Sequence, residues 1–258
     1  MFADSPPFRN RRDAGLKLAA ALAHLRKASP VVLALPRGGV PVAYEVARAL
    51  GAPLDVLLVR KIGAPGFPEL GLGAIVEGQP HQRVLNQALL DQLQPSPEYL
   101  AAEELRQLAE IERRRKVYCG ERPFPPLRGR TVIVVDDGIA TGGTMAAALK
   151  GLSQQGVARL VLAVPVAPPE IIERMRESVA ESVCLLTPEG FRAVGQYYED
   201  FAQTTDEEVV QLLTMAARDT AELGPGSSLH ALPPDAVADE APPDAGIPGE
   251  RQTHSETS

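Results

Sequence analysis

The residues best suited to chemistry lie in one short stretch of this 258-residue chain. Two carboxylates, Asp136 and Asp137, stand three residues ahead of a small, hydroxylated run: Ala140, Thr141, Gly142, Gly143 and Thr144. Glycine backbone can approach a phosphate closely, and threonine hydroxyls add hydrogen-bond donors. The carboxylates would repel a phosphate at contact distance, but slightly upstream they can accept hydrogen bonds from a vicinal diol. Phosphate donors beside diol acceptors describe a site for a ribose 5-phosphate group.

The flanking sequence supplies the elements that would position this loop. Thr131–Val135 is apolar and β-branched, which is typical of a strand buried on both faces of a parallel sheet. Met145–Lys150 is rich in helix-forming residues. A strand, a turn and a helix in this order aim backbone N–H groups and the positive end of a helix dipole at one point, so we predict that the loop binds an anion.

Rival motifs fit the chain poorly. There is no G-x-x-x-x-G-K-[ST] run, which excludes a nucleoside triphosphatase loop, and no G-x-S-x-G nucleophile turn. Gly71–Val76 has valine where a dinucleotide fingerprint needs its third glycine.

The run from Asp136 to Thr144 resembles the signature of the type I phosphoribosyltransferases, which bind 5-phosphoribosyl 1-pyrophosphate (PRPP). The resemblance implies that Asp136 and Asp137 bind the ribose hydroxyls and that Ala140–Thr144 binds the 5′-phosphate. Alanine stands at position 140, where the 6-oxopurine enzymes have aspartate, which counts against hypoxanthine or guanine as the acceptor.

A second strand–turn–helix unit lies earlier in the chain. The apolar run Val31–Leu35 predicts a strand, and its turn contains Arg37, Gly38 and Gly39. These three residues match the pyrophosphate loop of the same family, and the resemblance implies a strained, often cis, peptide there. On residue types alone, Arg-Gly-Gly would also suit any tight turn between a strand and a helix.

Arg60 and Lys61 follow a strand predicted at Leu54–Val59, in an Arg-Lys-x-Gly-x-Pro-Gly run similar to the segment after the second strand of adenine phosphoribosyltransferases. By that resemblance both cations would face the base or the pyrophosphate. Glu77 ends a predicted strand from Gly73 and would lie near the family's catalytic loop acid. Lys61, Glu77 and Arg37 are therefore the candidate catalytic residues, although these charges could simply cap strand ends.

Strand and helix patterns alternate along the chain, which implies an α/β fold with a doubly wound, mostly parallel sheet. The resemblance covers roughly residues 8–217 and places one domain over 1–223. It includes a helical insertion at about 78–127 and a small hood formed by about 187–217 with the N-terminal segment.

Three segments carry more specific expectations. Pro97–Tyr118 is predicted to be a helix with Leu100, Leu105, Leu108 and Ile111 facing inward and Glu103 and Gln107 facing outward. The basic run Arg113–Lys116 would interact with the dipole at its C-terminal end, with phosphate contact as the alternative. Phe8–Asp13 is expected to be a solvated arm rather than an ordered basic segment.

Composition limits the partners. The net charge is −7, but residues 224–258 hold six acids and one base, so residues 1–223 are near neutral and binding to nucleic acid is not expected. That acidic segment, rich in proline and glycine, is predicted to be a disordered tail. No apolar run is long enough to span a membrane, and the N-terminus lacks a signal-peptide core, so we expect a cytoplasmic protein. Cys119 and Cys184 form no metal or disulfide pattern.

The function that follows from the resemblance is transfer of a 5-phosphoribosyl group from PRPP to a nitrogenous acceptor, with release of pyrophosphate, as in nucleotide salvage. Mg²⁺ would be held mainly through PRPP, and a homodimer is expected by family. The alternative is a non-catalytic, PRPP- or nucleotide-binding regulatory module.

Overall fold

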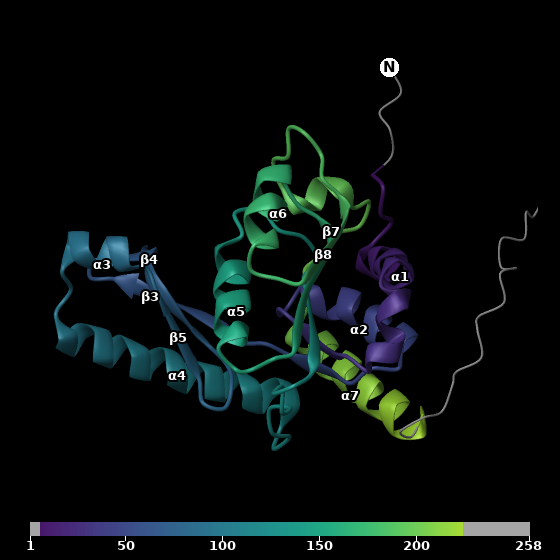
Figure 1. Ribbon diagram of the computed structural model, residues 1–258, viewed down its shortest axis with the longest axis horizontal. Coiled ribbons are helices and arrows are strands. Elements are labelled where there is room, and N and C mark those ends of the chain that lie inside the picture. Colours follow the sequence, from purple (N-terminus) through teal and green to yellow (C-terminus); the bar gives the residue numbers. More distant parts are fainter. Residues whose placement is uncertain (1–5, 224–258) are drawn as a thin grey trace, which may run out of the picture. The chain divides into compact units, whose positions relative to one another are not determined.

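The computed structural model of the chain describes residues 6–223 (Figure 1). The segment predicted to be a disordered tail, 224–258, lies outside the described residues, as do residues 1–5. Between residues 6 and 223, no helix combines the length and the apolar character that a membrane crossing requires.

A five-stranded parallel sheet forms the centre of the fold, in the spatial order β2-β1-β6-β7-β8. Its strands are β1 (Val31–Ala34), β2 (Leu54–Val56), β6 (Thr131–Val135), β7 (Arg159–Val166) and β8 (Glu181–Leu186). Taken in chain order these strands are arranged 2-1-3-4-5, so the winding direction reverses between β1 and β6. Sheets of this kind bind ligands at that reversal, outside the carboxyl ends of the strands. The predicted α/β fold is confirmed.

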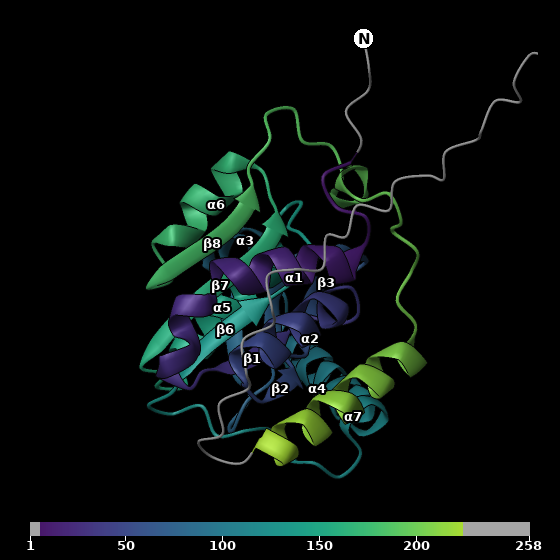
Figure 2. The same ribbon diagram turned by 90° about the vertical axis from the view of Figure 1, so that its right-hand side faces the viewer.

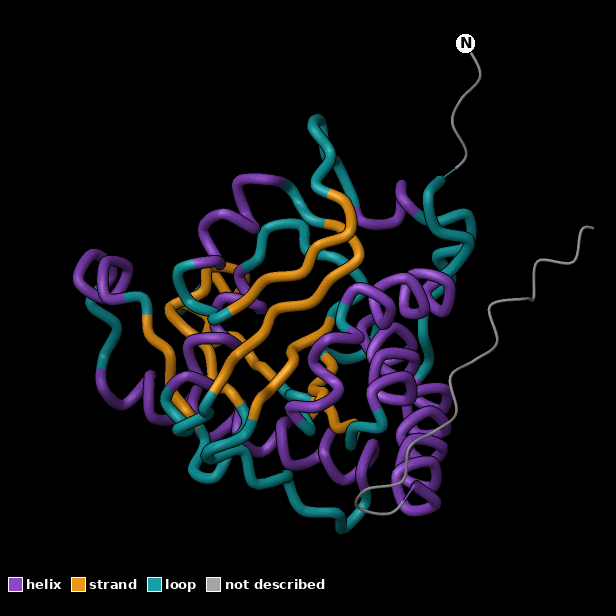
Figure 3. The backbone as a smooth tube through the Cα atoms, turned by 45° about the vertical axis from the view of Figure 1, so that its right-hand side comes forward, coloured by secondary structure: helices purple, strands orange, loops and turns teal. Residues whose placement is uncertain are grey.

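Helices cover both faces of the sheet (Figures 2 and 3). Successive residues of β1 alternate between two cores, because side chains on a strand point to opposite faces. Val32 and Ala34 belong to the core with the helices α1 (Arg11–Ala21), α2 (Gly39–Leu50) and α7 (Asp206–Leu223). Val31 and Leu33 belong to the core with α5 (Gly143–Ser153) and α6 (Pro169–Arg176). The apolar runs that predict doubly buried strands are therefore buried on both faces.

A separate antiparallel sheet consists of β3 (Val59–Ala64), β4 (Phe67–Val76) and β5 (Gln82–Leu85). The prediction of one strand over 54–59 was wrong at its end, because the parallel strand stops at Val56 and Val59 starts the second sheet. The Gly/Pro-rich run after Lys61 is a hairpin rather than a loop. Its turn uses Pro65 and Gly66, and Gly66 has a φ of +75°, the backbone that a tight turn requires of glycine.

The segment predicted as a helical insertion contains α3 (Gln87–Leu93) and the long α4 (Pro97–Cys119). The predicted orientation of α4 was wrong in part. Glu103 and Gln107 are buried, whereas Leu105 is 68% exposed. The reason is that a polar network lies between α4 and β3: Arg60 Nε donates to Gln107 at 3.0 Å, and Gln107 donates to Glu103 at 2.8 Å.

The expectation of a solvated arm at Phe8–Asp13 was wrong. Phe8 is 2% exposed and forms a bridge with Tyr198, its ring centroid 5.3 Å from that of the tyrosine. The backbone N–H of Phe8 donates to Tyr197, and that of Glu199 donates back to Phe8. Burying the aromatic ring fixes the N-terminal segment beside residues that follow β8. Two short 3₁₀ helices complete the described fold: η1 (Ala23–Ala28) follows α1, and η2 (Val194–Tyr197) follows β8.

Candidate functional site

The two predicted loops lie side by side, because β1 and β6 are neighbours in register, with Ala34 opposite Val135. The helices that follow, α2 and α5, begin after the N-cap glycines Gly38 and Gly142, and neither N-cap has a side-chain hydrogen bond. The first-turn N–H groups of α5 therefore remain available to an anion. In α2, the N–H groups of Gly39 and Val40 already donate to the carbonyls of Leu35 and Arg37, and Pro41 has no N–H. The peptide bond between Pro36 and Arg37 is cis, in the loop where the resemblance implied one.

The glycines of the first loop are required by its contact with the second. A Cβ at Gly38 would collide with the carboxylate of Asp137. A Cβ at Gly39 would lie 2.9 Å from the Cα of Asp136. Real side chains do not tolerate such distances, so the Arg-Gly-Gly sequence allows the carboxylate pair to pack against the start of α2.

The glycines of the second loop have different roles. Gly142 has a φ of +77°, a left-handed backbone conformation that favours glycine. A Cβ at Gly143 would meet no protein atom within 4 Å. The space in front of Gly143, at the first turn of α5, is thus open to a ligand.

Asp136 and Asp137 are partly buried at the end of β6. The N–H of Asp137 donates to Oδ1 of Asp136 at 2.8 Å, and Nε of Arg11 donates to Oδ2 of Asp137 at 2.8 Å. Burial and the adjacent Asp137 carboxylate raise the pKa of Asp136 well above its usual value. Burial also raises the pKa of Asp137, although Arg11 opposes that shift. Two adjacent carboxylates thus share one arginine, so ionising both is unfavourable until a ligand or an ion adds positive charge or hydrogen-bond donors.

Sequence reasoning missed Arg11 and Tyr198 as parts of the site. Arg11 stacks 3.9 Å above the ring of Phe201 and donates to the carbonyl of Ala202 at 2.6 Å. Tyr198 donates its hydroxyl to the backbone carbonyl of Asp137 at 2.5 Å. Because Arg11 and Asp137 are 126 positions apart, the only local signal is the basic cluster at the N-terminus, which by itself favours a solvated arm.

A cleft of about 770 Å³ lies between α4, the β3–β4 hairpin and the start of α5. Arg60, Lys61 and Thr144 all line it, which brings two predicted cations beside the predicted phosphate loop. An adjoining hollow of about 340 Å³ shares Lys61 and Thr144 and extends past Gly143. Arg37 lies outside the lining of both, and its Nη1 is 3.7 Å from Asp206.

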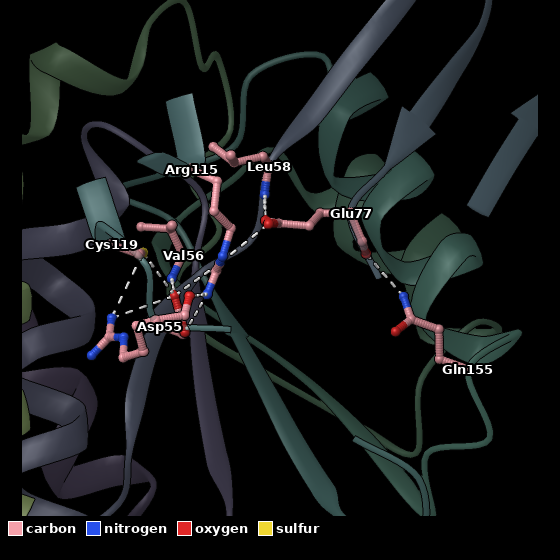
Figure 4. Close-up of polar contacts among 8 residues, drawn as sticks. Asp55, Val56, Leu58, Glu77, Arg115, Cys119 and Gln155 are labelled. Atoms are coloured by element: carbon pink, nitrogen blue, oxygen red, sulfur yellow. Dashed lines mark hydrogen bonds and ion pairs between the residues drawn. The ribbon is translucent and has the colours of Figure 1, made fainter. Parts of the chain in front are cut away.

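The structure separates Glu77 from the other predicted site residues (Figure 4). Glu77 is 2% exposed; its Oε2 accepts from the N–H of Leu58 at 3.1 Å, and its Oε1 lies 3.2 Å from Nη1 of Arg115. The same arginine donates to both oxygens of Asp55, at 3.2 and 2.9 Å. Burial raises the pKa of Glu77 to about 7, against the lowering effect of Arg115. One arginine of the basic run is thus an internal ion-pair partner rather than a helix-end charge.

The described residues offer few side chains that could hold a metal ion. Among residues 6–223 no three or more His, Cys, Asp or Glu side chains are grouped to hold a metal ion. Asp136 and Asp137 do supply two carboxylates next to the loops. That donor set fits Mg²⁺, which prefers oxygen ligands and in phosphate sites takes most of them from substrate and water.

A parallel sheet with helices on both faces, whose winding reversal carries two glycine loops beside a carboxylate pair, places the chain in the α/β class with its candidate site at that reversal. The family model described as "Phosphoribosyl transferase domain" matches residues 12–201. The chain belongs to this family.

Proteins of two Mycobacterium tuberculosis strains, each named "Putative phosphoribosyl transferase", are 49% identical to this chain over 217 residues. The match covers 84% of this chain and 48% of each relative, so the chain spans about half the length of these curated relatives. The crystal structure of TT1426 from Thermus thermophilus is 50% identical and covers 81% of this chain and 98% of that chain, with a TM-score of 0.71.

Proposed function

We propose that the chain transfers a 5-phosphoribosyl group from PRPP to a nitrogenous acceptor and releases pyrophosphate. The observation that carries the proposal is the junction of β1 and β6, where the uncapped start of α5 and the turn with Arg37, Gly38 and Gly39 lie beside Asp136 and Asp137. PRPP has a phosphate at one end, a diol in the middle and a diphosphate at the other end. This order matches the start of α5, the carboxylate pair and the turn before α2.

Each part of the site has a role in this proposal. The first turn of α5 with Thr141, Gly142, Gly143 and Thr144 binds the 5′-phosphate, since its N–H groups are free and the space before Gly143 is open. Asp136 and Asp137 accept hydrogen bonds from the ribose hydroxyls, and Arg11 holds Asp137 in position. Arg37, Gly38 and Gly39 bind the diphosphate at the start of α2.

The reaction needs few chemical groups from the protein. A bond forms between the acceptor nitrogen and the anomeric carbon, the bond from that carbon to the diphosphate oxygen breaks, and the nitrogen gives up a proton. Arg60 and Lys61 line the cleft beside Thr144 and would stabilise charge on the departing diphosphate. Mg²⁺ bound through PRPP would supply further charge neutralisation, with Asp136 and Asp137 as its protein-side carboxylates.

The enclosed position of Glu77 supports a second candidate function, a PRPP-binding regulatory module without turnover. It is enclosed by Leu58 and Arg115 and lines no part of the main cleft, so we assign it to the protein's interior rather than to catalysis. Glu69 of β4, on the exposed hairpin, lines both the main cleft and the adjoining hollow together with Lys61. A binding module needs no acid at all.

Turnover distinguishes the two candidates. The full chain would be incubated with PRPP, Mg²⁺ and a panel of purines, pyrimidines and simple amines, with diphosphate release measured and products identified by mass spectrometry. Binding would be followed by thermal unfolding, since a ligand at one hundred times its Kd adds about 2.7 kcal/mol to the free energy of unfolding. Gly143→Val is the matched control, because it fills only the open space in front of α5.

Acceptor-dependent diphosphate release by the wild type and not by Gly143→Val is the expected result. Stabilisation by PRPP without release would instead establish the binding module. If PRPP neither shifts the unfolding curve nor is consumed, both candidates are wrong.

A further inference from the structure

Three arginines from two distant parts of the chain surround one small hollow. Arg37 of the β1–α2 loop, Arg113 and Arg114 of α4 line a cavity of about 180 Å³, together with Val117, Tyr118 and Asp206. By liquid packing this volume holds about six waters, which is room for a compact anion. Arg113 also lines the 770 Å³ cleft that contains Lys61 and Thr144, so the hollow adjoins the main cleft.

The charges around this hollow do not cancel. Glu110 binds Arg113 through both oxygens, at 2.8 and 3.0 Å, and accepts from Nε of Arg114 at 2.7 Å. Asp206 lies 3.7 Å from Arg37 and accepts a hydrogen bond from Tyr118 at 2.7 Å. Burial and this bond raise the pKa of Tyr118 to about 12, so it stays neutral. Two acids against three guanidinium groups leave a surplus positive charge.

The guanidinium groups of Arg113 and Arg114 are also fixed in position by Glu110. Hydrogen bonds from Arg113 and Arg114 lower the pKa of Glu110 to about 2, so this acid is ionised and fixes both side chains at physiological pH. The ion pair of Arg114 uses its Nε, and its two terminal nitrogens take no part in it. A planar guanidinium with free terminal donors matches phosphate oxygens well.

We propose that Arg113 and Arg114 of α4 bind the diphosphate group of PRPP together with Arg37. The inference rests on the proposed function, in which the start of α5 binds the 5′-phosphate and the diphosphate lies at the start of α2 beside Arg37. It assigns a ligand to Arg113 and Arg114, whose hydrogen bonds are otherwise made to Glu110 of the same helix. Asp206 is then a counter-charge that competes with the bound anion for Arg37.

The test is calorimetry on the full chain with three ligands: PRPP, inorganic diphosphate and ribose 5-phosphate. Arg114→Gln should weaken binding of PRPP and of diphosphate about ten- to a hundred-fold, the usual loss for one charge-assisted hydrogen bond, and leave ribose 5-phosphate within about twofold. Arg113→Gln should act in the same direction. Its side chain is 62% exposed, so this variant is expected to fold even if Arg114→Gln does not.

Two further variants make the test specific. Lys116→Gln removes one charge from the same basic run, but this side chain is 78% exposed and faces a different hollow, so all three affinities should match the wild type. Asp206→Asn keeps an acceptor for Tyr118 and should strengthen diphosphate binding several-fold, because a competing charge is removed.

The outcomes separate this inference from the function beneath it. If the wild type binds all three ligands and neither arginine variant differs from it, the α4 assignment is wrong and the proposed function stands. If diphosphate binds and the arginine variants lose it, but ribose 5-phosphate does not bind, the hollow is an anion site and the phosphoribosyl proposal is wrong. A wild type that binds no diphosphate overturns the α4 assignment outright.

Discussion

Two clusters in this protein pair carboxylates with arginine, and they differ in how completely the charges are balanced. At the end of β6, Asp136 and Asp137 share one close arginine, Arg11. At the junction of β2, β4 and α4, Asp55 and Glu77 share Arg115, and Arg122 lies 3.6 Å from Asp55. We call these the site cluster and the junction cluster. Only the junction cluster has as many cations as acids.

The two clusters also differ in how open their surroundings are to a ligand. The site cluster packs against the turn before α2 and belongs to the loop that leads into α5, whose first N–H groups have no side-chain cap and are available to a ligand. In the junction cluster the side chain of Asp55 is 6% exposed and that of Glu77 is 3% exposed. Unbalanced charge beside free donors indicates ligand binding, whereas balanced, enclosed charge indicates structural pairing. Variants in each cluster should therefore affect different measurements.

The largest effect is expected in the site cluster. Replacing Asp136 and Asp137 together by Asn removes the charge-assisted acceptors for the ribose diol. At roughly 1.5–3 kcal/mol for each such bond, PRPP affinity should fall by about two to four decades. Inorganic phosphate, which has no diol, should bind as in the wild type, and calorimetry with both ligands measures the difference.

Asp55→Asn is the matched control from the junction cluster. It removes a carboxylate that, like that of Asp137, accepts hydrogen bonds from an arginine. It should lower stability while the folded protein keeps its PRPP affinity. Equal losses of PRPP and phosphate binding in the double Asn variant would mean that the aspartates hold the loop rather than the sugar.

Next in size is removal of Arg115. Arg115→Met leaves Asp55 and Glu77 as buried acids without their main cation, which usually costs about 3–5 kcal/mol of unfolding free energy. Urea unfolding should show this loss, and PRPP affinity measured on the folded fraction should be unchanged. Lys116→Met, one residue along and 78% exposed, should stay close to wild-type stability. A wild-type midpoint for Arg115→Met would mean that the junction cluster does not hold α4.

A third effect concerns pH. The pKa of Glu77 rises from 4.5 to about 7 on folding, so between these values the folded chain binds the proton more tightly than the unfolded chain. Stability must therefore decrease as pH rises through this window, by about 3 kcal/mol for Glu77 alone at 1.4 kcal/mol per pKa unit. Other groups with shifted pKa values, such as His81, Asp136 and Asp137, are present in both proteins, so subtracting the stability of Glu77→Gln isolates the contribution of Glu77.

Urea unfolding of the wild type and Glu77→Gln at pH 4.5, 6 and 7.5 gives the measurement. The stability of the wild type relative to the variant should fall steadily across this range. A constant difference would show that folding leaves the pKa of Glu77 near 4.5, because Arg115 offsets its burial.

The sequence allowed prediction of what is local. The strand before Asp136, the loop through Thr144 and the Arg-Gly-Gly turn are all encoded in contiguous residues, and the structure brings the two loops together because β1 pairs with β6. The parallel sheet followed from apolar runs that contact a core on each face.

What could not be predicted depends on contacts between distant residues. The pairing of Arg11 with Asp137 spans 126 positions, and no periodicity encodes it. The orientation of α4 was predicted from its leucines, but the face against β3 is polar, so Gln107 is buried while Leu105 is not. Glu77 follows β4 directly rather than ending it, and its role depends on Arg115, which the dipole argument had placed at a helix end.

The smallest effect should come from Arg122, the second cation of the junction cluster. Its Nη2 lies 3.6 Å from Asp55 and 3.7 Å from the sulfur of Cys119, and its buried Nε has no partner among the described residues. A buried donor without an acceptor is unfavourable, which offsets a weak ion pair. Arg122→Gln should therefore change the unfolding free energy by less than about 1 kcal/mol, as measured by urea unfolding beside Arg115→Met. A loss as large as that of Arg115→Met would show that both arginines, rather than Arg115 alone, hold Asp55 and Glu77 together.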